Sequence, residues 1–385
     1  MVKDVSYYVG NEGEFPILRG WDFFNHAGVS PLPRVGGEAL RAFAGQYEEK
    51  AYVDSGFYKR IEELRRSAAQ MIGAEKEEVA FIKNTSEGIA TVAGGIDWRA
   101  GDRVVTTGVE YPSNMYPWMD LARRVGIELV TVAETANEDG SRAVALEALL
   151  KAAEHPKTRM VTLSHVEYAS GQRHDLAKVG AFCRERGILF CVDAIQSMGV
   201  LPVDVKGMGI DYLAADGHKW LLGPEGAGVF YCRKELLQAT RPLAIGWMNV
   251  VNDQDYGDYD LTLKEDARRF ECGTHNVPGL LALKASLELL GGIGVERVAA
   301  RLRVLTDRLI GGLREKGYTV VSPRGGESWS GIVSFVSGRH DLGAIARMLR
   351  GEHRTEIAVR EGRLRVSAHV YNTEEQMDRL VSHLP

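Results

Sequence analysis

Lys219 stands in a setting that an ordinary surface lysine does not need. It lies in the stretch DGHKWLLGPEGAGVFY (216–231), directly after the apolar run YLAADGH. A lysine buried at such a position can lose its charge by desolvation and act as an amine that forms a Schiff base. Taken alone, a lysine beside a tryptophan is more often a surface residue whose stem covers apolar area.

An aspartate precedes this lysine by one predicted strand. Asp193 ends the apolar segment LFCV, where a carboxylate is costly to bury unless a partner is present. Gln196 follows it and could face the same crevice. Ligands of parallel sheets lie outside the carboxyl ends of the strands, so we expect Asp193 and Lys219 on one edge. The alternative is an ordinary turn aspartate after a strand.

A possible anion site follows the apolar segment VAFI. The stretch KNTSEGIA (83–90) places Thr85 and Ser86 in the first turn of a predicted helix. The free backbone N–H groups of such a turn bind phosphate, and Gly88 would permit a close approach. The stretch does not match the nucleotide-binding pattern GxxxxGK[ST], and an ordinary helix cap has the same composition.

Together these residues meet the chemical requirements of pyridoxal phosphate (PLP). That cofactor needs a lysine, an acid that keeps its ring nitrogen protonated, a phosphate site and usually a flat group over the ring. Tyr111, in GVEYPSN, could supply the flat group. A partly buried loop tyrosine is the alternative for Tyr111.

The elements that must position these residues alternate between strands and helices. Strands are predicted at 103–107, 127–132, 159–164, 188–192, 212–215 and 228–232, and helices at 119–125, 146–154 and 176–186. This rhythm predicts an α/β fold with a mainly parallel, helix-flanked sheet that binds PLP.

The pattern changes after about residue 279. Helices are predicted at 295–316, 342–349 and 373–384, and strands at 318–321, 331–336, 355–359 and 363–370. The last helix begins with TEEQ, a capping-box pattern. We predict a large PLP-binding domain over residues 18–285 and a smaller α+β domain over residues 286–385, which the N-terminal residues 1–17 join.

Composition limits the class of protein. The 385 residues are 45% hydrophobic and 26% charged, and the formal net charge is −5, so nucleic acid is not expected as a partner. No apolar run approaches the length of a membrane helix, and no apolar leader is present, so a cytoplasmic protein without membrane attachment is expected. The four cysteines lack CxxC spacing, so no metal site is expected.

The motifs resemble those of the class V aminotransferases, PLP-dependent enzymes of fold type I. This group includes cysteine desulfurases, isopenicillin N epimerase-like proteins and kynureninase. The matching stretches follow the family's order over most of the chain: KNTSEG, GVEYPSNMYPW, SHVEYASG, VDAIQS, DGHKW, FECGTHN and LRVSAHVYNTEEQMD.

The resemblance implies a role for each matching residue near the cofactor. Lys219 would hold PLP as an internal aldimine and move protons at the substrate α-carbon, and Asp193 would pair with the pyridinium nitrogen. The other implied cofactor contacts are Gln196 near the phenolic oxygen, Tyr111 over the ring, Tyr168 beside the cofactor, and Thr85, Ser86 and His218 at the phosphate.

The resemblance also implies substrate and subunit contacts. Arg365, in LRVSAHVYN, matches the arginine that binds the substrate α-carboxylate, a task that suits a bidentate guanidinium. Asn25 and His26, in FFNHAGVSP, match a segment that lines the substrate pocket. Thr274, in CGTHN, matches a residue that reaches the phosphate of the neighbouring subunit, which implies a homodimer with shared sites.

One departure from the desulfurases bears on function. Their persulfide-forming cysteine lies in a loop before the carboxylate-binding arginine, whereas AVREGRLRVSAHVYN contains no cysteine and leaves no room for that loop. We therefore expect no protein-bound persulfide. The remaining pattern is closer to the epimerase-like branch, which includes transaminases, racemases and C–S or C–N lyases.

The sequence thus predicts a PLP enzyme that acts on an α-amino acid through an external aldimine and loss of the Cα proton. Transamination and β-elimination of the C–S lyase type are the expected reactions. Epimerisation of the isopenicillin N epimerase type and a non-catalytic class V fold are the alternatives. A nucleotide-binding dehydrogenase would also have a parallel sheet, but its GxGxxG motif after an early strand is missing.

Overall fold

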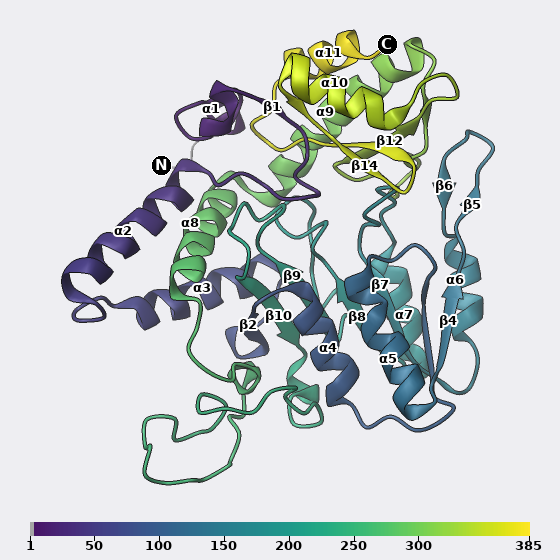
Figure 1. Cartoon of the computed structure of the whole chain (residues 1–385). Coiled ribbons are helices and arrows are strands. Elements are labelled where there is room, and N and C mark those ends of the chain that lie inside the picture. Colours follow the sequence, from purple (N-terminus) through teal and green to yellow (C-terminus); the bar gives the residue numbers. More distant parts are fainter. Residues whose placement is uncertain (1–3) are drawn as a thin grey trace.

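A seven-stranded sheet forms the centre of the protein in the computed structural model, which describes residues 4–385. The strands lie in the order β2-β10-β9-β8-β7-β3-β4 (Figure 1). Neighbours from β9 to β4 are parallel, whereas β10 is antiparallel to both β9 and β2. The predicted α/β fold with a mainly parallel sheet is confirmed. The bounds are β2 Val79–Ile82, β3 Arg103–Thr107, β4 Glu128–Val132, β7 Thr158–Ser164, β8 Leu189–Asp193, β9 Tyr212–Asp216 and β10 Gly228–Cys232.

Helices cover both faces of this sheet. The strands β7 to β10 contain no exposed residue, which explains why the sequence shows nearly continuous apolar runs there. Cys191 shares an apolar cluster with α4 and α5, whereas its neighbour Val192 shares one with α6, α7 and α8, because side chains alternate along a strand. The bounds are α4 Thr85–Gly95, α5 Tyr116–Val125, α6 Leu146–Ala153, α7 Leu176–Arg186 and α8 Val277–Ile293.

Two further helices, α2 (Arg34–Lys50) and α3 (Phe57–Met71), pack against α8, and α9 (Val295–Glu315) follows α8 after Gly294. Within residues 4–385, no single helix is long and apolar enough to cross a membrane; α8 and α9 meet that test only as a pair bent by 78°. The predicted boundary between residues 285 and 286 falls inside α8, and the division into two domains stays a prediction.

A second, antiparallel sheet lies near the C-terminus, in the order β11-β12-β15-β14. The helix α11 begins after Thr373, which forms the predicted capping box with Gln376. This smaller α+β part of the chain is confirmed. Its elements are β11 Thr319–Val320, β12 Ile332–Val336, α10 Leu342–His353, β14 Ala358–Arg360, β15 Arg363–Ser367 and α11 Glu374–His383.

The strand predicted over residues 355–359 is wrong as a single element. Thr355 and Glu356 form β13, which pairs in parallel with β1 (Asp22–Phe23), whereas Ala358 begins β14 and pairs with β15. The chain changes partners at this point because the N-terminal segment supplies a strand. That segment also contains α1 (Val5–Tyr8), and Phe15 stacks on Tyr371 with ring centres 4.2 Å apart. Residues 1–3 lie outside the described part of the chain. The strands β5 (Thr135–Ala136) and β6 (Arg142–Ala143) form a separate hairpin.

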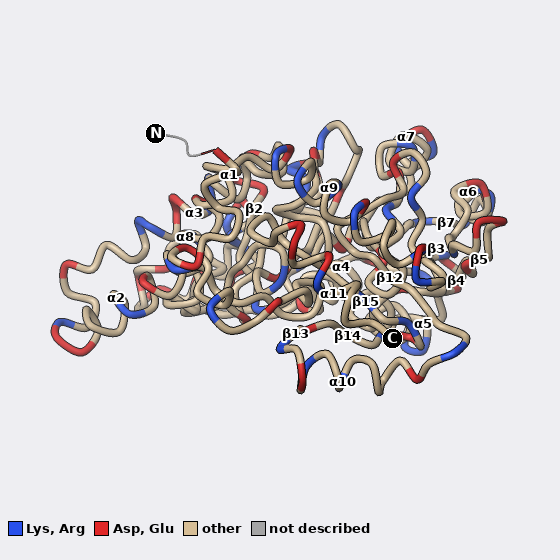
Figure 2. The backbone as a smooth tube through the Cα atoms, turned by 90° about the horizontal axis from the view of Figure 1, so that it is seen from above, with Lys and Arg blue, Asp and Glu red and all other residues tan. Residues whose placement is uncertain are grey.

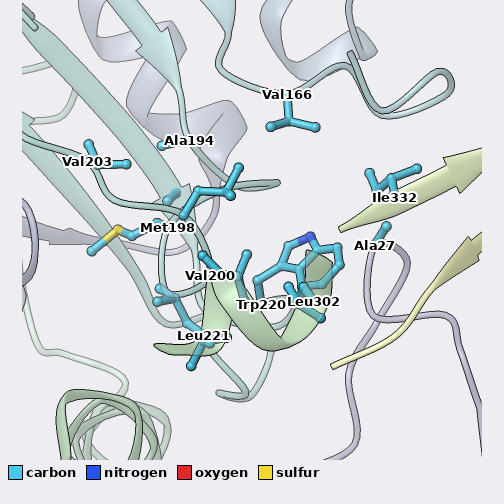
Figure 3. Close-up of a cluster of buried hydrophobic side chains, with 14 of the residues drawn as sticks. Ala27, Val166, Ala194, Met198, Val200, Val203, Trp220, Leu221, Leu302 and Ile332 are labelled. Atoms are coloured by element: carbon cyan, nitrogen blue, oxygen red, sulfur yellow. The ribbon is translucent and has the colours of Figure 1, made fainter. Parts of the chain in front are cut away.

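Trp220 fills the space between the two sheets. Its ring lies between Leu302 of α9 and Ile332 of β12, with Ala27 of the N-terminal segment nearby (Figure 3). A Cβ atom added to Gly331 would fall 2.9 Å from the Trp220 ring, so this contact is tight. The tryptophan that follows Lys219 is therefore a buried anchor, and it fixes the backbone that carries the lysine.

Charged residues are spread around the outside of the molecule. Lysine and arginine alternate with aspartate and glutamate along α2, α6 and α7 (Figure 2). Exposed pairs such as Arg34–Glu38, with nitrogen and oxygen 2.7 Å apart, contribute about 1 kcal/mol or less each.

Candidate active site

A cavity of about 420 Å³ opens where β8 and β9 end. Every predicted site residue except Asn25, His26 and Thr274 lines it. The full lining is Ala27, Gly28, Val29, Asn84, Thr85, Ser86, Tyr111, Ser113, Tyr168, Asp193, Ile195, Gln196, Asp216, His218, Lys219, Arg360 and Arg365. The structure therefore brings Lys219 and Asp193 together at the sheet edge where the sequence placed them.

Lys219 and Asp193 are both buried, at 7% and 1% exposure. Burial lowers the pKa of the Lys219 ammonium to about 8, although Asp193 favours its charge. Burial also raises the pKa of the Asp193 carboxyl to about 6, although the Ile195 N–H donates to it at 3.0 Å and Lys219 attracts its charge. Both groups can thus change protonation near neutral pH, as acid–base chemistry requires.

The N-terminus of α4 faces the same cavity. The Asn84 side chain caps the helix by accepting from the Glu87 N–H, and the Thr85 hydroxyl accepts from the Asp216 N–H at 3.0 Å. The hydroxyl oxygens of Ser86 and Ser113 lie 2.8 Å apart. A first turn with free N–H groups beside these hydroxyls is suited to a phosphate.

Gly88 has a different task from the expected one. A Cβ atom there would lie 2.6 Å from the Ala214 Cβ in β9, and Gly88 is absent from the cavity lining. Its small size lets α4 approach the sheet rather than a ligand. His218, by contrast, does line the cavity, and its Nδ1 lies 2.8 Å from Asp216 Oδ2.

Two tyrosines and one amide form the walls beside Lys219. The Lys219 Nζ lies 5.3 Å from the centre of the Tyr111 ring, and Tyr168 meets that ring edge-on at 5.2 Å. Gln196 is fixed from both ends, because its Nε2 donates to the Ala27 carbonyl and its Oε1 accepts from the Trp220 indole. Contacts within the protein therefore fix the Gln196 side chain and bring the two tyrosine rings together.

Arg365 is the most unusual charge in the cavity wall. It is 1% exposed. Within the described residues it donates only to the Tyr168 carbonyl at 2.8 Å and to Asn25 Oδ1 at 3.4 Å, and its buried Nε has no partner. Burial, with help from the nearby charge of Arg360, lowers its pKa to about 9. A buried guanidinium without a carboxylate can accept one from a ligand.

Three predicted residues lie away from the cavity lining. Asn25 touches Arg365, which lines the cavity. His26 is fully buried, and its ring nitrogens lie 2.8 Å from the Ser367 carbonyl and 2.7 Å from the Tyr371 hydroxyl. Thr274 is exposed and lines a second cavity of about 200 Å³. Their roles toward substrate and neighbouring subunit stay predictions.

Four polar residues at the cavity were missed: Asn84, Ser113, Asp216 and Arg360. Ser113 follows Tyr111 by two positions, and Arg360 precedes Arg365 by one hairpin turn. The signal for Arg360 was present in AVREGRLR, because a two-residue turn returns both arginines to the same end of a hairpin.

That turn also bears on the missing cysteine. Glu361 and Gly362, with φ of 46° and 67°, connect β14 directly to β15, as the short segment in the sequence predicted. In the described residues, Cys183, Cys191 and Cys232 are buried and Cys272 is exposed, and none of them lines the cavity. The absence of a protein-bound persulfide stays a prediction.

Comparison with known proteins identifies the family. The model of the aminotransferase class V family matches residues 37–380. The chain belongs to the class V aminotransferase family. A probable cysteine desulfurase of Pyrococcus abyssi is 32% identical, over 96% of this chain and 95% of that protein.

Two solved structures share the fold over nearly the full length. The cystine C–S lyase C-DES, solved with its reaction product cysteine persulfide, has a TM-score of 0.87 and 28% identity, covering 96% of this chain and 98% of that one. The apo cysteine desulfurase of Thermococcus onnurineus NA1 has a TM-score of 0.86 and 29% identity, covering 95% and 94%. A variant of C-DES carries glycine covalently linked to PLP.

PLP is the cofactor of this class V enzyme, and the residues of the cavity fit it. Lys219 supplies an amine whose pKa burial lowers to about 8, and Asp193 supplies a buried acid. The first turn of α4 and the neighbouring hydroxyls of Thr85 and Ser86 would hold the phosphate. Arg365 remains free for a substrate carboxylate.

Proposed function

We propose that this enzyme is a PLP-dependent C–S lyase that cleaves a cysteine-derived amino acid with two carboxylates, such as cystine, by β-elimination. The observation that carries the proposal is the pair of guanidinium groups, Arg365 and Arg360, in one cavity with Lys219. Cystine has a carboxylate at each end, so one guanidinium is available for each. The C–S lyase name of one relative and the desulfurase names of others support the reaction type.

Arg365 would orient the substrate. Its Tyr168 and Asn25 contacts fix the guanidinium while leaving donors free, so a substrate carboxylate can bind in the bidentate manner. Arg360 is exposed at the cavity and would take the second carboxylate. Two fixed ends hold the bond to be cleaved between them.

Lys219 would remove the proton from the substrate α-carbon. The cofactor, when bound, supplies the electron sink that makes this proton acidic. Asp193 would hold a proton on the ring nitrogen, and Tyr111 would cover the ring and exclude water. Because burial lowers the pKa of Lys219 to about 8, a larger fraction of its amine is unprotonated near neutral pH and able to accept this proton.

The sulfur would leave with a small molecule. Elimination breaks the Cα–H and Cβ–S bonds, and hydrolysis then yields pyruvate, ammonia and, from cystine, cysteine persulfide. No described cysteine lines the cavity, which favours a free persulfide over a protein-bound one.

We also propose that the enzyme is a homodimer in which Thr274 reaches the phosphate site of the partner. The exposure of Thr274 beside a second cavity supports this arrangement. Light scattering after gel filtration measures the dimer, and Thr274→Ala should weaken PLP binding without changing the subunit fold.

The test of the reaction combines absorbance with product analysis. Purified protein should show the absorption of lysine-bound PLP, and L-cystine should yield equal amounts of pyruvate and ammonia with a persulfide detected by trapping. Release of D-amino acid would instead indicate epimerisation, and consumption of a keto acid would indicate transamination. A colourless protein that ignores added PLP would refute the proposal.

A further inference from the structure

Three carboxyl groups lie buried together at one side of the cavity. Asp193 ends β8, Glu167 follows β7, and Glu110 follows β3; their exposures are 1%, 0% and 7%. Within residues 4–385, neither glutamate forms an ion pair with a lysine or arginine. Burying an ionised carboxylate without a cation is expensive, so this group of acids needs an explanation.

Glu110 is held beside Asp193 through Ser164. Its two carboxyl oxygens accept from the N–H and the hydroxyl of Ser164, each at 2.6 Å. Ser164 of β7 lies directly opposite Asp193 of β8 in the sheet register. The charge of Asp193 is therefore felt at Glu110 and disfavours a second anion there.

Glu167 has a less complete set of partners. Its Oε1 accepts from the Thr107 hydroxyl at 2.9 Å and lies 3.0 Å from His174 Nε2, whereas its buried Oε2 has no hydrogen-bond partner in the described residues. Burial lowers the pKa of His174 to about 4, so this imidazole supplies no positive charge at neutral pH. The Thr107 hydroxyl then favours the anion, whereas burial without a lysine or arginine partner in the described residues favours the neutral acid at Glu167.

The three acids cannot all be ionised. Burial is the main cause that raises the pKa of Glu167 to about 8 and that of Glu110 well above its ordinary value. Asp193 differs because Lys219 and the Ile195 N–H favour its anion. Protons therefore belong on the glutamates, and the charge belongs on Asp193.

We propose that Glu167 is a positioning residue that carries a proton at neutral pH and so leaves Asp193 as the charged carboxylate facing the cofactor ring. Only the cofactor ring as the partner of Asp193 rests on the proposed function; the proton on Glu167 does not. When Glu167 loses its proton at alkaline pH, a second negative charge arises beside Asp193. The groups that face Glu167 are Thr107, Glu110, Glu134, Tyr168, His174 and Asp193.

The proton on Glu167 can be counted directly in the cofactor-free protein. Infrared spectra at neutral pH should show a band from the buried protonated carboxyls of Glu110 and Glu167, and Glu167→Gln should remove the Glu167 share of it. Glu271→Gln is the matched control: it removes an equally buried carboxyl that is paired with Arg65 at 2.6 Å, so the band should stay. If Glu167→Gln leaves the band intact, Glu167 is an anion and the proposal fails.

The loaded enzyme supplies a second readout. Glu167→Gln should keep kcat at pH 7 within about fivefold of wild type, because an amide replaces a neutral acid and costs about one ordinary hydrogen bond. The bound cofactor of wild type should show an absorption change centred near pH 8, which the variant lacks. A loss of more than about tenfold at pH 7 would mean that a charge was removed, and would overturn the proposal.

If Glu167→Gln does not fold, Thr107→Val provides a second test of the assignment. The Thr107 hydroxyl stabilises the Glu167 anion by donating to it, so its removal should move the alkaline transition to higher pH. An unmoved transition would contradict the assignment to Glu167. The infrared result does not depend on PLP, so failure of the proposed function and failure of this inference can be told apart.

Discussion

Arg65 and Arg365 are both buried, at 2% and 1% exposure, yet the hydrogen-bond partners of the two guanidinium groups differ. Arg65, on α3, donates to both oxygens of Glu271, at 2.6 and 3.1 Å, and to the Val79 carbonyl at 2.8 Å. Arg365, on β15, has a carbonyl and a weak amide contact and faces the cavity.

The electrostatic consequences differ accordingly. Burial opposes the charge of Arg65, but Glu271 raises its pKa above the ordinary value; burial lowers the pKa of Arg365 to about 9 because no anion compensates. Burial alone therefore does not mark a functional charge. A buried charge that opens onto a cavity and lacks its counterion does, because a ligand can supply it.

The largest test concerns Lys219, a second buried cation of the cavity. Within the described residues its Nζ has no hydrogen bond and no ion pair. Lys219→Ala should abolish the absorption of lysine-bound PLP and lower kcat by about 10²–10⁴-fold, the usual contribution of a general base. The control is Lys284→Ala, which removes a half-buried lysine paired with Glu63 and Glu288 and should leave both readouts unchanged. Retained turnover in Lys219→Ala would place the chemistry elsewhere.

A pair of variants tests the comparison itself. Arg65→Met breaks a complete buried ion pair and should cost about 3–5 kcal/mol of unfolding free energy, because Glu271 is left unpaired. Arg365→Met removes a charge that nothing compensates, so stability should be nearly unchanged while KM for cystine rises about 10- to 100-fold. Urea unfolding of the cofactor-free proteins and steady-state kinetics measure the two effects. Equal losses of stability would show that Arg365 is a structural residue.

The sequence could predict the sheet edge that carries Asp193 and Lys219. Parallel strands end on a common edge, and the apolar runs before both residues identify those strands. It could also have predicted α3, whose Ile61, Leu64 and Ala68 follow helical spacing. The helix α8 is harder, because it is apolar on most sides and gives little periodic signal.

Contacts between distant segments could not be predicted from local patterns. Glu110 and Glu167 each follow a strand, but only the fold shows that both are buried beside Asp193 and that no lysine or arginine of residues 4–385 pairs with them. The placement of Asn25 against Arg365 depends likewise on the N-terminal segment reaching β15. Such sites depend on residues that lie tens to hundreds of positions apart in the chain, and composition and periodicity do not encode their pairing.

The pH dependence of Lys219 offers a smaller effect. With its pKa lowered to about 8, the neutral fraction of the amine should rise about tenfold between pH 7 and 9. The rate at which cofactor-free protein takes up PLP covalently, followed by absorbance, should rise in proportion. Between about pH 8 and 10.5 this lysine is protonated in the unfolded protein but not in the folded one, so the free energy of unfolding should rise with pH. Lys219→Met should remove this contribution to the pH dependence of stability. A rate that is flat over this range would contradict a buried amine.

Arg360 gives the smallest expected effect because it is exposed, whereas Arg365 is buried at the same cavity. An exposed ion pair contributes about 1 kcal/mol at most, so Arg360→Ala should raise KM for cystine by no more than about fivefold. For S-methylcysteine, which has one carboxylate, KM should not change, because Arg365 alone binds it. Added salt should reduce the cystine effect, since water screens an exposed charge. An equal rise for both substrates would show that Arg360 acts on the site's general potential rather than on the second carboxylate, and the division of work between the two arginines would be wrong.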